Sequence, residues 1–220
     1  MAYVFGPVPS RRLGRSLGVD LVPFKTCPYD CIYCQLGATT HKTDQRQTLA
    51  PPEVIIEELR DKIAAQPDYI TLGGSGEPSL YQELGPLIRA IKSFTTVPVA
   101  VLTNGSLLWR QELRSSLLQA NLVVPSLDAG SEAVFQAVNR PVDGLSFETM
   151  LEGLIAFRDE FRGAYWLEIF LLAGYNDHEE EVRKMAACAR RIRPDRIQLN
   201  TVSRPPTESF AEPVPPDHMA

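Results

Sequence analysis

The stretch YITLGGSGEPSLYQELGPLIRAIKSFTTVPVAVLTNG, residues 69–105, contains one full repeat of the pattern that decides the fold. Two short apolar runs, residues 69–72 and 97–102, predict buried strands, and a glycine turn follows each of them. The residues from 80 to 94 have the length and the apolar spacing of a helix. A strand, a helix and a second strand in this order are typical of a parallel sheet with right-handed crossovers.

The same alternation continues on both sides of this stretch. We expect further strands at residues 16–22, 122–124, 166–172 and 196–202. We expect further helices at residues 51–63, 107–119, 131–138, 147–161 and 178–191, the last of them capped by Asp177, and none after the last strand. Six strand–helix units are fewer than the eight of a closed barrel. The sequence therefore predicts an α/β fold that is either an open partial (βα)6 barrel or a doubly wound sheet, with ligands at the carboxyl ends of the strands.

Length, composition and charge exclude several classes of protein. The chain has 220 residues, of which 44% are hydrophobic, so it can bury a core and is not disordered. Its net charge of −5 gives no general attraction to nucleic acid or to an anionic membrane. It has neither a signal peptide nor an apolar run of about 20 residues, so we expect no membrane partner and a cytoplasmic location. We divide the chain into a core domain, residues 1–203, and a proline-rich tail, residues 204–220.

The four cysteines are distributed as three and one. Cys27, Cys31 and Cys34 lie within eight residues, directly after the first predicted strand, and Cys188 lies alone in a predicted helix as a core residue. Three thiolates can hold a [4Fe–4S] cluster and leave one iron without a protein ligand, as a catalytic cluster requires. A non-catalytic metal-binding module is the alternative. It would be either an electron-transfer iron–sulfur protein or a structural zinc site that takes His41 or water as its fourth ligand.

Polar and glycine residues follow three of the predicted strands. Gly74 and Gly76 would let the backbone come close to a ligand, and Glu77 offers a carboxylate to an ammonium group. The alternative for this segment is a plain turn before a helix. Asn104 follows the next strand, and Ser126 and Asp128 follow the one after it; each of these residues also suits a turn or a helix cap.

The cysteine spacing, with the aromatic Tyr33 before the last cysteine, resembles the signature of the radical S-adenosylmethionine (SAM) enzymes. The glycine-rich segment resembles the motif of these enzymes that holds the amino group of SAM. The resemblance implies a partial (βα)6 barrel, with a [4Fe–4S] cluster and SAM as cofactors. It implies metal ligation by Cys27, Cys31 and Cys34, and SAM contacts from Tyr33, Gly74, Gly76, Glu77, Asn104, Ser126 and Asp128.

The same resemblance implies an activity. A radical SAM enzyme cleaves SAM reductively to a 5′-deoxyadenosyl radical, which abstracts hydrogen from a substrate; the substrate here is unidentified. An external electron donor of the flavodoxin or ferredoxin type is implied as well. Segments such as Ser126-Leu-Asp-Ala-Gly130 are similar to uncharacterised iron–sulfur oxidoreductases, which are distantly similar to enzymes that build wyosine bases in tRNA. A tRNA base is therefore an alternative substrate, although the net charge of −5 disfavours it.

Several charged and polar residues have two open interpretations. A basic group before the first predicted strand is either a solvated turn or an anion contact near the cluster, and Arg204 is a further candidate for that contact. Polar residues within the last two predicted strands point either into the barrel or toward solvent. These residues are Arg11, Arg12 and Arg15 in the first group and Glu168, Gln198 and Asn200 in the second.

Overall fold

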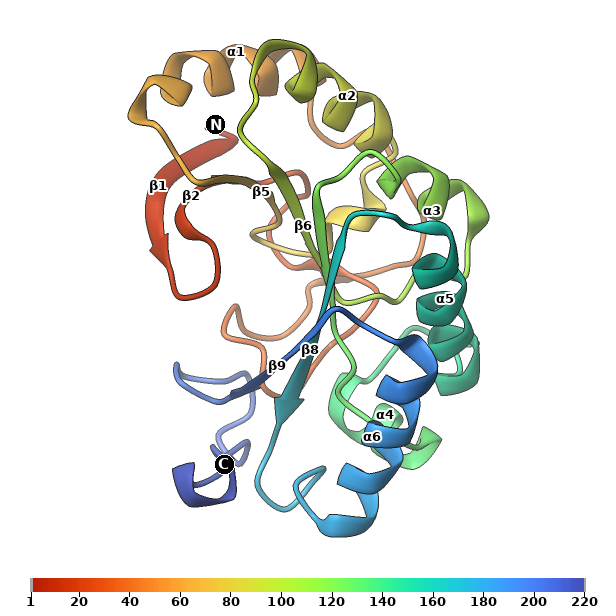
Figure 1. Cartoon of the computed structure of the whole chain (residues 1–220). Helices are drawn as coiled ribbons and strands as arrows, with labels where there is room; N and C mark the ends of the chain where they lie inside the picture. Colours follow the sequence, from red (N-terminus) through yellow and green to blue (C-terminus); the bar gives the residue numbers. More distant parts are fainter. Residues whose placement is uncertain (1, 220) are drawn as a thin grey trace.

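The computed structural model describes residues 2–219, which form one curled seven-stranded sheet with helices on its outer side (Figure 1). The main elements in chain order are β1 (Val4–Ser10), β2 (Gly14–Val19), α1 (Pro52–Lys62), β5 (Tyr69–Leu72), α2 (Leu84–Phe94), β6 (Val99–Thr103), α3 (Gln111–Leu117), β7 (Leu122–Pro125), α4 (Glu132–Asn139), α5 (Phe147–Glu160), β8 (Ala164–Leu171), α6 (Glu179–Ile192) and β9 (Arg196–Thr201). Two short strands, β3 (Thr26–Cys27) and β4 (His41–Lys42), pair with each other apart from the main sheet.

The order of the strands confirms the predicted half-barrel. The sheet runs β1-β2-β5-β6-β7-β8-β9, and every neighbouring pair from β2 to β9 is parallel. In Figure 1, helices α1, α2, α3, α5 and α6 follow one another around the outside of the sheet. Because each parallel strand is the neighbour of the next one in the chain, the structure is a partial barrel and not a doubly wound sheet.

Different sets of side chains pack on the two faces of the sheet, as the strand β8 shows. Tyr165, Leu167 and Ile169 alternate along it, are buried, and belong to the large core under the helices. Trp166 faces the other way and packs against a small cluster inside the barrel, made of Leu13, Ala100, Leu122 and Val124. A fully buried leucine or isoleucine stabilises the fold by about 1.5–3 kcal/mol, so the outer core carries most of the stability.

The first strand, β1, is a feature that the sequence did not predict. It pairs antiparallel with β2, and its register shifts between Phe5 and Val8. Pro7 and Pro9 argue against a strand in the sequence. Proline is tolerated in an edge strand, however, because one side of that strand makes no hydrogen bonds to a neighbouring strand. Arg11 and Arg12 therefore lie in the β1–β2 turn, and Arg15 lies within β2.

Some predicted helix boundaries were wrong. The helix expected at residues 80–94 is a 3-10 turn, Pro78–Leu80, followed by α2 from Leu84, and the helix expected at residues 107–119 covers only Gln111–Leu117. Asp177 does not cap α6, because its Oδ1 accepts a hydrogen bond from the Gly174 N–H at 2.8 Å. His178 stands at the cap position instead and makes no side-chain cap hydrogen bond.

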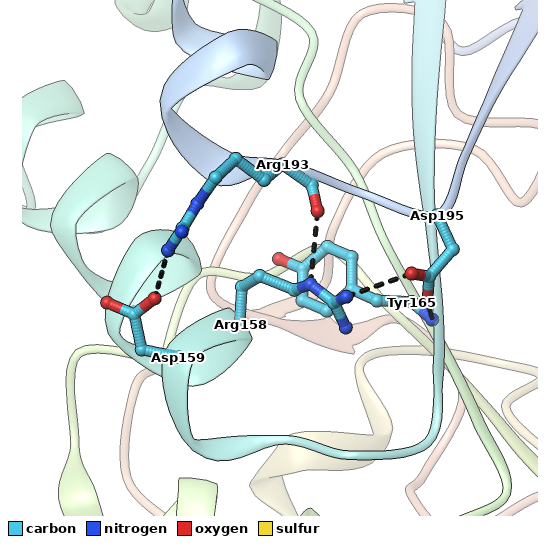
Figure 2. Close-up of polar contacts among 5 residues, drawn as sticks. All are labelled: Arg158, Asp159, Tyr165, Arg193 and Asp195. Atoms are coloured by element: carbon cyan, nitrogen blue, oxygen red, sulfur yellow. Dashed lines mark hydrogen bonds and ion pairs between the residues drawn. The ribbon is translucent and has the colours of Figure 1, made fainter.

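Ionic contacts hold β8 and β9 at their amino ends, away from the carboxyl ends where ligands are expected (Figure 2). Arg158, near the end of α5, donates to Asp195 Oδ1 at 2.9 Å and to the Arg193 carbonyl at 3.0 Å. Asp195 also accepts a hydrogen bond from the Tyr165 N–H at 2.8 Å, and Arg193 pairs with Asp159. These contacts fix the point at which the chain enters its last strand.

The tail folds back onto the rest of the chain. Ala211 and Val214 are buried, and Pro216–His218 forms a 3-10 turn. No helix within the described part of the chain is long and apolar enough to cross a membrane.

Candidate active site

The three clustered cysteines lie on a loop beyond the carboxyl end of β2. We call residues 27–34 the cysteine loop and residues 73–78, which follow β5, the glycine loop. The Glu77 N–H of the glycine loop donates to the carbonyl of Thr26, the residue directly before the cysteine loop, at 3.0 Å. On its other side the cysteine loop is held by the Ile32 N–H, which donates to the Val138 carbonyl at 3.0 Å. Cys27, Cys31 and Cys34 are free thiols of intermediate exposure.

Each of the three sulfurs accepts a hydrogen bond from a side-chain nitrogen. The pairs are Asn104 Nδ2 with Cys27 Sγ at 3.3 Å, Asn139 Nδ2 with Cys31 Sγ at 3.4 Å, and Lys25 Nζ with Cys34 Sγ at 3.3 Å. Such donors favour a thiolate over a thiol. The donors come from the chain before the cysteine loop, from the loop after β6 and from the end of α4, so the fold brings one to each sulfur.

Burial acts on the thiols in the opposite direction. It raises the pKa of Cys27 to about 12, with a smaller contribution from Glu77, and it raises the pKa of Cys31 well above its usual range, with Asp128 as the next cause. Free thiols at these positions therefore keep their protons. A metal that binds these sulfurs displaces the protons, so the bound form is the thiolate.

The donor set fits an iron–sulfur cluster better than a single zinc ion. Within residues 2–219, no group of three or more His, Cys, Asp and Glu side chains forms a site for one metal ion. A cubane has no need of such a site, because each of its cysteines binds a different iron. His41, the fourth ligand considered for zinc, is exposed, and β4 pairs it with Thr26 through the backbone.

Glu77 joins the ends of β5 and β6. It is 3% exposed, and its carboxylate accepts hydrogen bonds from the Thr103 hydroxyl at 2.5 Å, the Asn104 N–H at 2.7 Å and the Ser79 N–H at 3.0 Å. Burial raises the pKa of Glu77, while these three hydrogen bonds oppose the rise. The carboxylate thus holds Asn104 in place beneath Cys27.

Gly76 is required by the close approach of the two loops. A Cβ at this position would lie 2.2 Å from the Thr26 carbonyl oxygen and 2.8 Å from Val22. At Gly74 a Cβ would lie 3.0 Å from the Asp20 carboxylate, which accepts a hydrogen bond from the Ser75 N–H at 3.0 Å. The absence of side chains at both positions lets the glycine loop pack directly against the chain that leads into the cysteine loop.

Asp128 supports the cysteine loop from the side of β7. It is 4% exposed and accepts hydrogen bonds from the Tyr33 hydroxyl at 2.5 Å and from Asn139 Nδ2 at 2.8 Å. The Tyr33 ring stacks on Phe170 with a centroid distance of 4.0 Å. Burial raises the pKa of Asp128, and these hydrogen bonds oppose the rise. Asp128 holds Asn139, which in turn donates to Cys31 Sγ, so its visible role is to position the loop.

Polar side chains also line the inside of the barrel. Glu168 shares the inner face of β8 with Phe170, forms an ion pair with Arg12, and accepts a hydrogen bond from Asn200 Nδ2 at 2.9 Å. Gln198 is the register partner of Glu168 on β9. Its buried Oε1 has no hydrogen-bond partner within residues 2–219. The inward interpretation of these polar residues is therefore the correct one.

A cleft of about 460 Å³ opens beside Cys34. Its walls come from the β1–β2 turn, the end of the cysteine loop, the inner face of β8 and the end of β9. Arg11, Arg12 and Arg204 all line it, although about 190 residues of chain separate the first from the last. Ser126 is not among its lining residues; it forms an isolated bridge with Glu168 at the end of β7.

The structure therefore brings most of the predicted site residues together around the cysteine loop. Arg15 lies elsewhere, with Nη2 donating to the Ala65 carbonyl at 2.7 Å. Sequence reasoning missed Lys25 and Asn139 as partners of the sulfurs. Asn139 stands at the end of α4, and nothing local in the sequence shows that this end reaches the cysteine loop.

Comparisons with known proteins agree with this geometry. The family model of the radical SAM superfamily matches residues 21–186. A UPF0026 protein of Methanocaldococcus jannaschii is 38% identical over 217 residues, which cover 97% of this chain and 67% of that protein. A Brachyspira hyodysenteriae protein named GTPase Obg is 49% identical over 203 residues, which cover 91% of this chain and 30% of that protein.

Solved structures share the fold. Streptococcus suis SuiB bound to S-adenosylmethionine superposes with a TM-score of 0.67 at 14% identity, over 90% of this chain and 43% of that one. The chain thus spans less than half of SuiB and under a third of the Brachyspira protein. With the family model matching most of its length and the cysteine loop in place, the chain belongs to the radical SAM superfamily, whose members are enzymes that use a [4Fe–4S] cluster and SAM.

Proposed function

We propose that Cys27, Cys31 and Cys34 hold the [4Fe–4S] cluster and that this chain cleaves SAM reductively to act on a substrate still to be identified. The observation that carries the proposal is the set of three free thiols on one loop, each with its own nitrogen donor. When bound, the cluster and SAM supply a 5′-deoxyadenosyl radical that abstracts hydrogen from the substrate.

The residues of this chain then have two tasks. The first is to hold SAM, for which we propose the glycine loop with Gly74, Gly76 and Glu77 at the methionine end, and Asn104 and Ser126 along the strand ends. SuiB, which has the same fold, is solved with S-adenosylmethionine bound, and this supports SAM as the ligand. The second task is to keep the cysteine loop in place, and the hydrogen bonds of Glu77 and Asp128 perform it. We also propose an external reductant of the flavodoxin or ferredoxin type.

We further propose that the substrate enters the cleft beside Cys34. Arg12 in this cleft is paired with Glu168, whereas Arg11 and Arg204 form no ion pair within residues 2–219. A guanidinium binds a carboxylate or a phosphate through two parallel hydrogen bonds. The cleft therefore suits a small substrate that carries one of these anionic groups.

Anaerobic reconstitution with iron and sulfide tests the cluster assignment. We expect the wild-type protein to bind about four irons, to develop the visible absorbance of an iron–sulfur cluster, and to release 5′-deoxyadenosine from SAM with a reductant. Cys31→Ser should lose both properties. Cys188→Ser is the matched control and should keep both, because Cys188 lies on α6, facing the core and outside the cysteine loop.

The Cys188→Ser control also shows whether Cys31→Ser loses iron because a ligand is missing or because the protein unfolds. A colourless wild-type protein that binds zinc and leaves SAM intact would contradict the proposal and support the non-catalytic alternative. Equal cluster content in wild-type and Cys31→Ser protein would remove Cys31 from the ligand set.

A further inference from the structure

A buried lysine beside the cysteine loop carries a charge that the function proposed above does not use. Lys25 is 3% exposed, and its Nζ donates to Cys34 Sγ at 3.3 Å. No carboxylate within residues 2–219 forms an ion pair with it. A buried ammonium without a counter-charge is costly, so this position suits a group that brings negative charge when it binds.

The backbone of Lys25 is fixed on both sides. Its N–H donates to the Ser75 carbonyl at 2.6 Å, and its own carbonyl accepts from the N–H groups of Thr40 at 3.2 Å and His41 at 3.1 Å. Its φ angle of 59° lies in the left-handed region, which is strained for a residue with a side chain. The hydrogen bonds to the glycine loop and to β4 hold this conformation, and with it the direction in which the ammonium points.

Lys25 differs in charge from the other two sulfur donors. Asn104 and Asn139 give neutral amide N–H groups to Cys27 and Cys31, whereas Lys25 gives a cation to Cys34. A [4Fe–4S] core with three thiolates is anionic in both oxidation states and gains one further negative charge on reduction. Net charge and hydrogen bonds to sulfur set the potential of such a cluster.

We infer that Lys25 is a positioning residue that pairs with the Cys34 thiolate and raises the reduction potential of the cluster. The inference rests on the proposed function, because it requires the cluster. It adds to that function an electrostatic reason why the bound cluster accepts an electron from its donor more readily. The neighbouring charge stabilises the reduced state more than the oxidised state, because the reduced state is the more negative one.

The test is the midpoint potential of the reconstituted cluster, measured by electron paramagnetic resonance without SAM. For Lys25→Met we expect a shift of the reduction equilibrium by at least about tenfold toward the oxidised state, which is about 59 mV for a one-electron couple. Lys25→Arg keeps the charge and should stay close to the wild type. Lys42→Met is the control: it removes an exposed lysine of β4 whose register partner is Cys27, so solvent screens its effect.

Each outcome decides the question. A wild-type potential in Lys25→Met, or in Lys25→Gln, which keeps an N–H donor without the charge, overturns the inference. If Lys25→Met is folded by circular dichroism but binds no iron, the potentials of Lys25→Arg, which keeps the charge, and Lys25→Gln, which does not, are compared instead, and equal potentials overturn the inference. If neither Lys25→Met nor Lys25→Arg binds iron, the inference is overturned, since the lysine then serves only to shape the loop. A wild-type protein without a cluster refutes the proposed function instead.

Discussion

At the scale of single residues, the site depends on very short contacts between loops that are distant in the chain. Gly76 is the clearest example, because the glycine loop touches Thr26, directly before the cysteine loop, at the place that a side chain of residue 76 would occupy. Its φ angle lies outside the left-handed region, so the reason for glycine here is space and not backbone conformation.

Gly76→Ala tests this contact. The added methyl would meet the Thr26 carbonyl oxygen at 2.2 Å, so one of the loops must move. We expect a loss of about 1–3 kcal/mol in the free energy of unfolding, measured with urea, and a lower iron content after reconstitution. Gly144→Ala is the control: a Cβ there meets no atom within 4 Å, but φ is +83°. It should destabilise the fold through backbone strain and leave the iron content unchanged. Equal iron content in both variants would contradict the role given to Gly76.

At the scale of elements, contacts at both ends of the strands hold the half-barrel together. At the amino ends, the group shown in Figure 2 joins α5, the end of α6 and the start of β9. At the carboxyl ends, the loops after β5, β6 and β7 meet the cysteine loop. Because the two ends are separate, the first group affects stability without touching the site.

Asp195 lets this separation be measured. Asp195→Ala removes the partners of the Arg158 guanidinium and the Tyr165 N–H, and we expect it to lower the free energy of unfolding by about 1–3 kcal/mol. Asp195→Asn keeps an acceptor for the Tyr165 N–H and should lose less. Thermal unfolding and iron content measured together are the check. A variant that loses iron in proportion to its stability would show that the two ends are coupled.

Much of the fold could be predicted from the sequence, because its signals are local. The parallel strands are apolar runs that end in glycine or polar residues, and the cysteine spacing lies within eight residues. β1 was missed because its prolines argue against a strand, and only the pairing with β2 makes it one. The contacts of Lys25 and Asn139 with sulfur were missed for a related reason: they are set by tertiary packing, which leaves no local signal.

At the scale of the whole molecule, charge is distributed unevenly. The chain carries a net charge of −5, yet the cleft beside Cys34 has three guanidinium groups and one carboxylate, Glu168, on its walls. We therefore expect the cleft to attract small anions to one place on an otherwise anionic molecule.

Titration with inorganic phosphate, followed by phosphorus NMR, tests the cleft. We expect the wild-type protein to broaden the phosphate signal and the double variant Arg11→Gln/Arg204→Gln to reduce the broadening at least severalfold. Arg183→Gln/Arg190→Gln, which makes the same charge change on exposed positions of α6, should behave like the wild type. Equal broadening by the two double variants would show that the cleft has no special affinity for anions.

The hydrogen bonds of the cysteine loop also determine when, during synthesis, the loop can be completed. The Cys34 carbonyl accepts a hydrogen bond from the Thr207 hydroxyl at 2.9 Å, across 173 residues, and the Ile32 carbonyl accepts one from the Glu208 N–H at 3.0 Å. At about 5–20 residues per second, a ribosome needs roughly 10–35 s to make the chain between these partners. These two hydrogen bonds of the cysteine loop can therefore form only after residues 207 and 208 have been made, well after its three thiols.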